Sequence, residues 1–162
     1  AAFMNPVLCM NDVDWTSPRC GRVAYTYAQF AAAKSWFFAR WSDWASDRGL
    51  VAPPDLSGSC KYASLYMQSI FGGAIRGHFE HQYNFIDGRL VDLSHDALDV
   101  GRMHHPYLHE PDYFSVPELQ AALVSCQPRA ERWAHEFIEH SEAALADERA
   151  IRDAGALRPT GP

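Results

Sequence analysis

The sequence lacks any run that approaches the ~20 apolar residues a helix needs to cross a bilayer. It also lacks an N-terminal basic segment followed by a long apolar run, so no signal peptide is evident. Acidic residues outnumber basic ones and the formal net charge is −6, whereas nucleic-acid-binding surfaces are basic. We therefore expect a soluble protein that binds neither nucleic acid nor membrane, located in the cytoplasm or secreted without a readable signal.

Cysteine is scarce and shows no metal-binding spacing. The four cysteines, at positions 9, 20, 60 and 126, form no C-x-x-C pair and no tight disulfide framework. A Cys9–Cys20 bridge is possible, but a reducing compartment is the better default, and we expect Cys9, Cys20 and Cys126 to be small buried apolar side chains. The cluster His104, His105 and His109 has no cysteine or carboxylate at a recognised ligand spacing, so we expect neither a metal nor a cofactor.

The composition is that of one globular domain. The chain has 162 residues, of which 48% are apolar and 21% charged, enough to bury a real core. Turn-forming residues crowd residues 1–22, which we expect to be irregular, and residues 155–162 resemble a flexible tail. Residues 101–114, rich in His, Pro and Tyr, are expected to form a loop beside a cleft.

Helical patterns occur on both sides of the centre of the chain. The longest runs over residues 26–48, begins at the N-cap candidate Thr26, and is apolar on more than one face. Such a helix lies either within the core, which we favour, or offers an aromatic face to a partner. Ser115 and Glu118 fit a capping box for a helix to about Cys126, and Pro128 predicts the start of another.

Residues 57–73 predict a helix that presents a cysteine in its first turn. Ser57 and Ser59 are good N-cap residues, apolar residues recur at helical spacing from Tyr62, and Gly72-Gly73 favours the end of the helix. Unpaired backbone N–H groups and the positive end of the helix dipole both favour the thiolate of Cys60.

A β-hairpin follows, and its register can be worked out. Asp87-Gly88 between β-forming runs indicates a two-residue turn, so the numbers of cross-strand partners sum to 175. Strand alternation then divides the hairpin into two faces. One face carries His81, Tyr83, Phe85, Leu90, Asp92 and Ser94, and the other carries Gln82, Asn84, Ile86, Arg89, Val91 and Leu93. His81 and Asp92 become diagonal neighbours roughly 7 Å apart at the backbone.

The helix and the hairpin together supply the residues that an activated thiol nucleophile needs. His81 can act as the base or as the imidazolium partner of Cys60, and Asp92 can orient the ring and stabilise its charged form.

The same residues resemble a known group of proteins. A helical cysteine, then His and an aromatic residue on a strand, then Asp after a D-G turn resembles the core of transglutaminase-like and papain-like cysteine enzymes. Short bacterial proteins of the YunG family are more similar still, over about a quarter of the chain. The shared segments are Cys60, Phe71-Gly72-Gly73, His81-Gln82-Tyr83-Asn84 and Asp87 to Leu93. The resemblance implies Cys60 as nucleophile, His81 as base and Asp92 as orienting acid, within a minimal α+β fold in which helices flank a small antiparallel sheet.

The oxyanion donor is less clear from the sequence. Ser59 stands where the closer family has a glutamine, and Pro54 lies upstream where papain-like enzymes have one. Candidates are the backbone N–H of Cys60 and the side chains of Ser59 and Gln82. Tyr83 and Tyr107 are candidate substrate contacts.

We therefore expect cysteine-dependent acyl transfer on peptide or glutamine-type amides, as in a peptidase, a deamidase or a transglutaminase, with a protein or peptide as substrate. Two alternatives are a non-catalytic binding module on the same fold and an effector that deamidates a host protein. The sequence does not determine the oligomeric state.

Overall fold

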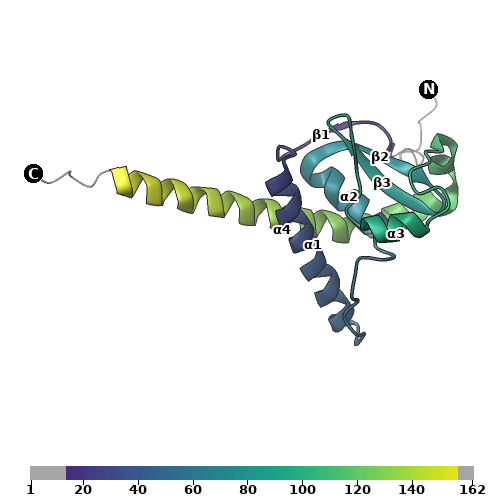
Figure 1. Ribbon diagram of the computed structural model, residues 1–162, viewed down its shortest axis with the longest axis horizontal. Coiled ribbons are helices and arrows are strands. Elements are labelled where there is room, and N and C mark those ends of the chain that lie inside the picture. The colour runs from purple at the N-terminus through teal and green to yellow at the C-terminus, as the bar shows by residue number, and fades with distance from the viewer. Residues whose placement is uncertain (1–13, 157–162) are drawn as a thin grey trace, which may run out of the picture.

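The computed structural model describes residues 14–156 and has an α+β architecture in which helices flank a four-stranded antiparallel sheet (Figure 1). The sheet order follows the chain, β1-β2-β3-β4. The elements are β1 (Arg19–Cys20), α1 (Tyr27–Asp47), α2 (Cys60–Phe71), β2 (Gly72–His78), β3 (His81–Ile86), β4 (Arg89–Val91), α3 (Ala97–Arg102), the 3-10 helix η2 (Pro111–Ser115) and α4 (Pro117–Ala156). The α+β class expected from the sequence is confirmed.

The hairpin of β3 and β4 has the predicted register. Asn84 pairs with Val91, Phe85 with Leu90 and Ile86 with Arg89. Asp87 and Gly88 form the turn with φ values of 51° and 72°, as a type I′ turn requires. β4 ends at Val91, so Asp92 and Ser94 continue beyond the regular ladder.

Helix α2 lies against the sheet and also packs along α4. It starts at Cys60, with Ser59 at the N-cap, and ends at Phe71 before the two glycines, as predicted. Asn84 Nδ2 donates to the Ser64 carbonyl of α2 at 2.9 Å, which ties β3 to the helix. Ile86, Val91 and Leu93, which share one predicted face of the hairpin, belong to the apolar core.

Helix α1 contributes one face to the core. Thr26 caps it as predicted, accepting a hydrogen bond from the Gln29 N–H. Ala33, Phe37 and Ala45 are buried, whereas the indoles of α1 remain partly exposed. The Phe37 ring contacts Tyr66 of α2 at a tilt and Trp133 of α4 edge-on, so α1 is joined to both helices through aromatic rings.

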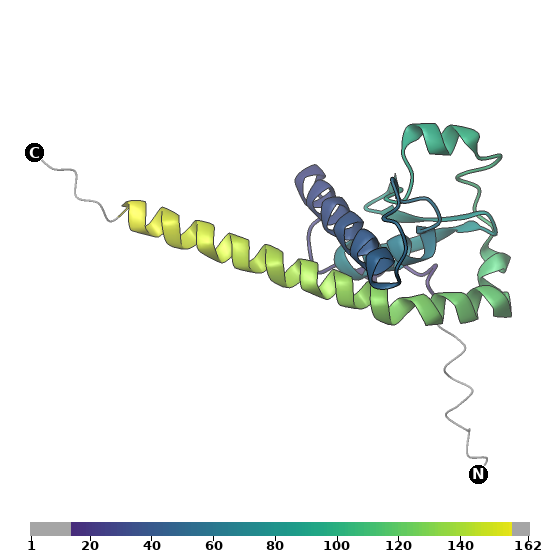
Figure 2. The ribbon, with the colours of Figure 1, turned by 90° about the horizontal axis from the view of Figure 1, so that it is seen from below.

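Residues 117–156 form one helix, and the predicted break at Pro128 is wrong. The buried residues of α4 continue past the proline at helical spacing: Leu119, Leu123, Cys126, Ala130, Trp133, Ala134, Phe137 and Ile138. Packing of this stripe outweighs the backbone hydrogen bond that proline cannot donate. The helix starts at Pro117, so the expected capping box at Ser115 does not form, and Ser115 ends η2 instead. Beyond the core, α4 projects away from the other elements (Figures 1 and 2).

Other segments also differ from expectation. Within the expected irregular segment 1–22, Arg19–Cys20 forms the edge strand β1, which pairs with Gly72 and Gly73; residues 1–13 lie outside the described residues. The expected tail is helical to Ala156, and the rest of it is outside the described part. Cys126 is buried as expected, whereas Cys20 is exposed because a two-residue edge strand has little to cover it; Cys9 is among the undescribed residues.

Within residues 14–156, no helix is both long enough and apolar enough to cross a membrane.

Candidate active site

Cys60 lies at the first residue of α2, next to the N-terminal end of β3. Its thiol donates to Gln82 Oε1 at 3.3 Å, and the residue is partly exposed. The N–H groups of the first helical turn have no partner within the helix and point toward the end at which the sulfur lies. The sulfur is therefore beside polar groups rather than enclosed by hydrocarbon.

His81 and Asp92 are in contact as the hairpin register predicted. His81 Nε2 and Asp92 Oδ2 are 2.9 Å apart, and the two side chains are only 0% and 6% exposed. The other ring nitrogen, Nδ1, is buried and has no hydrogen-bond partner among the described residues. One nitrogen is thus held by the carboxylate, while the other has no competing hydrogen bond in the described chain.

Cys60 and His81 shift each other's pKa values. Burial alone raises the pKa of Cys60, but interactions with the His81 ring and with the Gln82 backbone N–H outweigh it, so the pKa lies below the ordinary 9.0. Burial alone lowers the pKa of His81, yet hydrogen bonding with Asp92 and interaction with the Cys60 thiol raise it to about 9. Both shifts favour a thiolate paired with an imidazolium.

Asp92 is fixed by two further hydroxyl groups. Ser94 Oγ donates to Asp92 Oδ1 at 3.2 Å and the Tyr107 hydroxyl donates to Oδ2 at 3.2 Å. Tyr107 is held in turn, because the Tyr83 hydroxyl donates to its carbonyl oxygen at 2.8 Å. The hydroxyls of Tyr83 and Tyr107, expected to contact substrate, therefore take part in the hydrogen bonds that hold Asp92. Tyr107 belongs to the segment 101–114, which was expected to border a cleft.

Gln82 and Ser59, the two side chains considered as oxyanion donors, are both buried. Gln82 Nε2 donates to the His78 carbonyl at 2.7 Å, while its Oε1 accepts from the thiol. Ser59 is fully buried and its hydroxyl has no partner in the described part of the chain. The backbone N–H groups at the start of α2 remain the best-placed donors, and Cys60 contributes the first of them.

His95 belongs to the site and was not found from the sequence. Its ring packs edge-on against the His81 ring with centroids 4.5 Å apart. Burial and the neighbouring His81 cation lower the pKa of His95, so it stays neutral beside the charged ring. His95 lies beyond β4, which ends at Val91, so the hairpin register does not place it.

A groove of about 570 Å³ is lined by residues of α1 and α4 and by none of the site residues. A smaller hollow of about 120 Å³ is lined in part by Ser94 and His95 of the site. Across residues 14–156, no three His, Cys, Asp or Glu side chains are grouped to hold a metal. Of the three histidines considered as ligands, His109 instead accepts a hydrogen bond from the Gly77 N–H at 3.2 Å.

Comparison with models of known families, with curated proteins and with solved structures finds no match to this chain. The resemblance to the YunG family and to papain-like and transglutaminase-like enzymes stays a prediction based on the motifs.

Proposed function

We propose that this protein is a cysteine-dependent acyl-transfer enzyme that acts on peptide or glutamine-type amides. One observation carries the proposal: the His81 ring is held through Nε2 by Asp92, while its unpartnered Nδ1 belongs to a ring that depresses the pKa of Cys60. A thiolate with a fixed proton donor beside it is what nucleophilic attack on an amide requires.

Cys60, His81 and the first N–H groups of α2 are sufficient for every step of the reaction. The Cys60 thiolate attacks the amide carbonyl carbon, and the developing oxyanion lies near the first N–H groups of α2. Protonated His81 gives its proton to the amide nitrogen as the C–N bond breaks, releasing ammonia or an amine and leaving a thioester. Neutral His81 then takes a proton from water, or from an amine, as that nucleophile attacks the thioester. The C–S bond breaks, and the product is a carboxylic acid or a new amide.

The test is alkylation by iodoacetamide, with each cysteine quantified by peptide mass spectrometry as pH is varied. Cys20, an exposed thiol on β1, is the internal reference. We expect the Cys60 rate to reach its plateau below pH 9 because interaction with His81 lowers the thiol pKa. His81→Ala should slow Cys60 at pH 7 by about tenfold for each unit by which its pKa rises, without changing Cys20.

A folded His81→Ala variant with unchanged Cys60 reactivity would refute the activated thiol. It would then favour the non-catalytic binding module, since the fold would persist without an activated nucleophile. Circular dichroism of both proteins verifies that the variant is folded.

A further inference from the structure

Positive charge gathers around Trp44 and the first turn of α2 although the chain as a whole is acidic. Arg48 and Arg129 lie on the Trp44 ring, with guanidinium carbons 3.7 Å and 4.2 Å from its centroid. Trp44 contacts the Tyr62 ring at 5.1 Å, and Tyr62 lies in the first turn of α2, two residues after Cys60. We call Arg48, Arg129, Lys61, Trp44 and Tyr62 the basic–aromatic patch.

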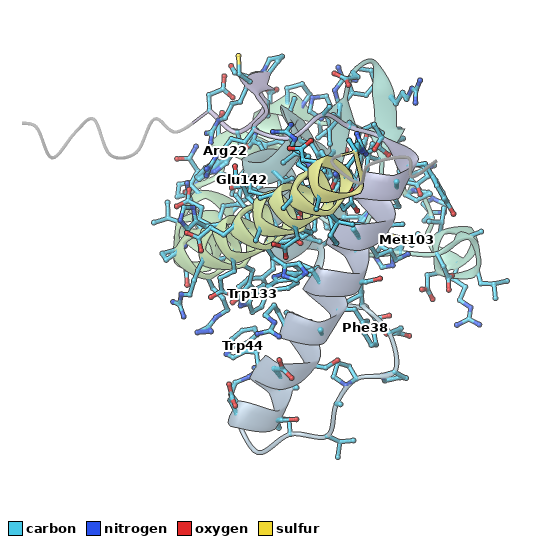
Figure 3. All side chains as sticks on the ribbon, turned by 90° about the vertical axis from the view of Figure 1, so that its left-hand side faces the viewer. Arg22, Phe38, Trp44, Met103, Trp133 and Glu142 are labelled. Atoms are coloured by element: carbon cyan, nitrogen blue, oxygen red, sulfur yellow. The ribbon has the colours of Figure 1, made fainter. Side chains whose placement is uncertain are left out.

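The patch is continuous with the candidate active site. Lys61 and Tyr62 directly follow Cys60 in the first turn of α2, and the charge of Lys61 contributes to the lowered pKa of Cys60. The charges on Arg129 and Arg48 in turn act on Tyr62. Figure 3 shows Trp44 toward one end of α1 with Trp133 of α4 beside it, and their rings are 6.0 Å apart. The patch thus runs from the first turn of α2, which also carries Cys60, to the junction of α1 and α4.

The patch cations have no carboxylate of their own. None of the three forms an ion pair within residues 14–156, although the net charge of the sequence is −6. The acidic residues nearest in sequence do not neutralise them. Asp47, next to Arg48, makes no ion pair in the described chain, and Glu131 accepts from Gln127 and lines a separate groove with Arg22. Guanidinium groups stacked on an indole keep their outward N–H donors available to carboxylates.

We propose that the basic–aromatic patch binds an acidic peptide segment and that this segment belongs to the acyl donor. Carboxylates of the substrate would contact Arg48, Arg129 and Lys61, placing a neighbouring glutamine-type amide at Cys60. The aromatic surface of Trp44 and Tyr62 would cover the apolar parts of the same segment. This inference rests on the proposed function, because it identifies the substrate class of that site.

The binding experiment uses Cys60→Ala, which cannot react, so its result is independent of catalysis. Three fluorescein-labelled peptides of equal length each carry one central glutamine, flanked by glutamates, by further glutamines or by lysines. We expect anisotropy to report tighter binding of the acidic peptide by about tenfold, weakening as salt rises from about 0.02 to 0.3 M. Arg129→Gln should remove several-fold of this preference, and Arg152→Gln on the projecting part of α4 should remove none. Equal binding of all peptides, or equal effects of the two variants, would overturn the proposal.

A second measurement tests whether the bound segment reaches the nucleophile. Excess acidic peptide should slow alkylation of Cys60 in the unmodified chain while leaving Cys20 unaffected. Binding that leaves Cys60 unprotected would refute the assignment of the peptide as acyl donor. Failure of the thiol itself is recognised separately, because Cys60 would then show no elevated reactivity even without peptide.

Discussion

Asp92 decides the charge state of His81 at the residue scale. A buried imidazole alone would lose its proton more easily than in water, yet the carboxylate at 2.9 Å and the thiol raise the pKa of His81 to about 9. The hydroxyls of Ser94 and Tyr107 fill two further acceptor positions of this largely buried carboxylate. In the proposed function, the reactivity of Cys60 would therefore depend on a residue that contacts the ring and not the sulfur.

Replacing Asp92 by Asn tests this dependence. The amide keeps the shape of the side chain but removes the charge, so we expect the pKa of His81 to fall and the cation beside Cys60 to disappear at neutral pH. Alkylation of Cys60 at pH 7 should slow by about tenfold, as followed by mass spectrometry. Asp112→Asn, an exposed change in η2, is the control. An unaltered rate in Asp92→Asn would show that the carboxylate does not tune the thiol.

The Asp92→Asn variant should also change how the free energy of unfolding depends on pH. Because the pKa of His81 is about 9 in the folded chain and 6.5 in an ordinary imidazole, the folded state binds the proton more tightly. This stabilisation is fully present below pH 6.5 and is lost as pH rises to 9. Asp92→Asn should flatten this part of the pH dependence.

At the scale of elements, the close approach of β2 and β3 sets the position of His81. Gly77 pairs with Gln82 and has a φ of 138°, and a Cβ there would lie 2.1 Å from the His81 carbonyl oxygen. Only glycine allows the two strands to approach so closely beside the site. The two-residue turn at the other end of β3 fixes which face His81 occupies.

Gly77→Ala should therefore disturb both the fold and the site. We expect the free energy of unfolding to fall by roughly 2 kcal/mol or more, because the new methyl meets backbone in a backbone conformation that alanine rarely adopts. Urea unfolding followed by circular dichroism measures the loss, and Gly101→Ala, with open space around its Cα, is the matched control. Equal stabilities of the two variants would contradict the close approach.

On the scale of the whole molecule, aromatic rings join the three long helices. Trp133 of α4 contacts Phe37 and Trp44 of α1 and Tyr62 of α2 with centroids 5.6 to 6.0 Å apart. Trp133 is 5% exposed, so its ring is the buried centre of an aromatic cluster that includes Trp44 and Tyr62 of the basic–aromatic patch. Helix α4 supplies this cluster only because it runs through Pro128 without a break.

Trp133→Ala should cost about 3–5 kcal/mol of unfolding free energy, because it leaves a cavity where three helices meet. Circular dichroism in urea measures this without relying on tryptophan emission. Leu145→Ala, in the projecting part of α4 and with 48% of Leu145 exposed, should change stability by less than about 1 kcal/mol. If the Trp133 variant were as stable as the Leu145 variant, the cluster could not be what joins the helices.

The sequence by itself determined the local parts of this protein. The start and end of α2, the cap of α1 and the register of the hairpin follow from short-range patterns, and the register was sufficient to bring His81 to Asp92. Each depends on residues within a few positions of one another, so no knowledge of distant contacts is needed.

Only the tertiary structure decided what depends on residues far apart in the chain. Pro128 remains inside α4 because packing of the helix against α2 exceeds the local cost of the proline. Tyr107 donates a hydrogen bond to Asp92, and the His95 ring packs against the His81 ring. Arg48 and Arg129 both lie on the Trp44 ring. None of these contacts follows from the periodicity of the sequence. Local sequence preferences identified Cys60, His81 and Asp92. Long-range packing determined the neighbouring groups that set the charges of these side chains, and also the surface beside them.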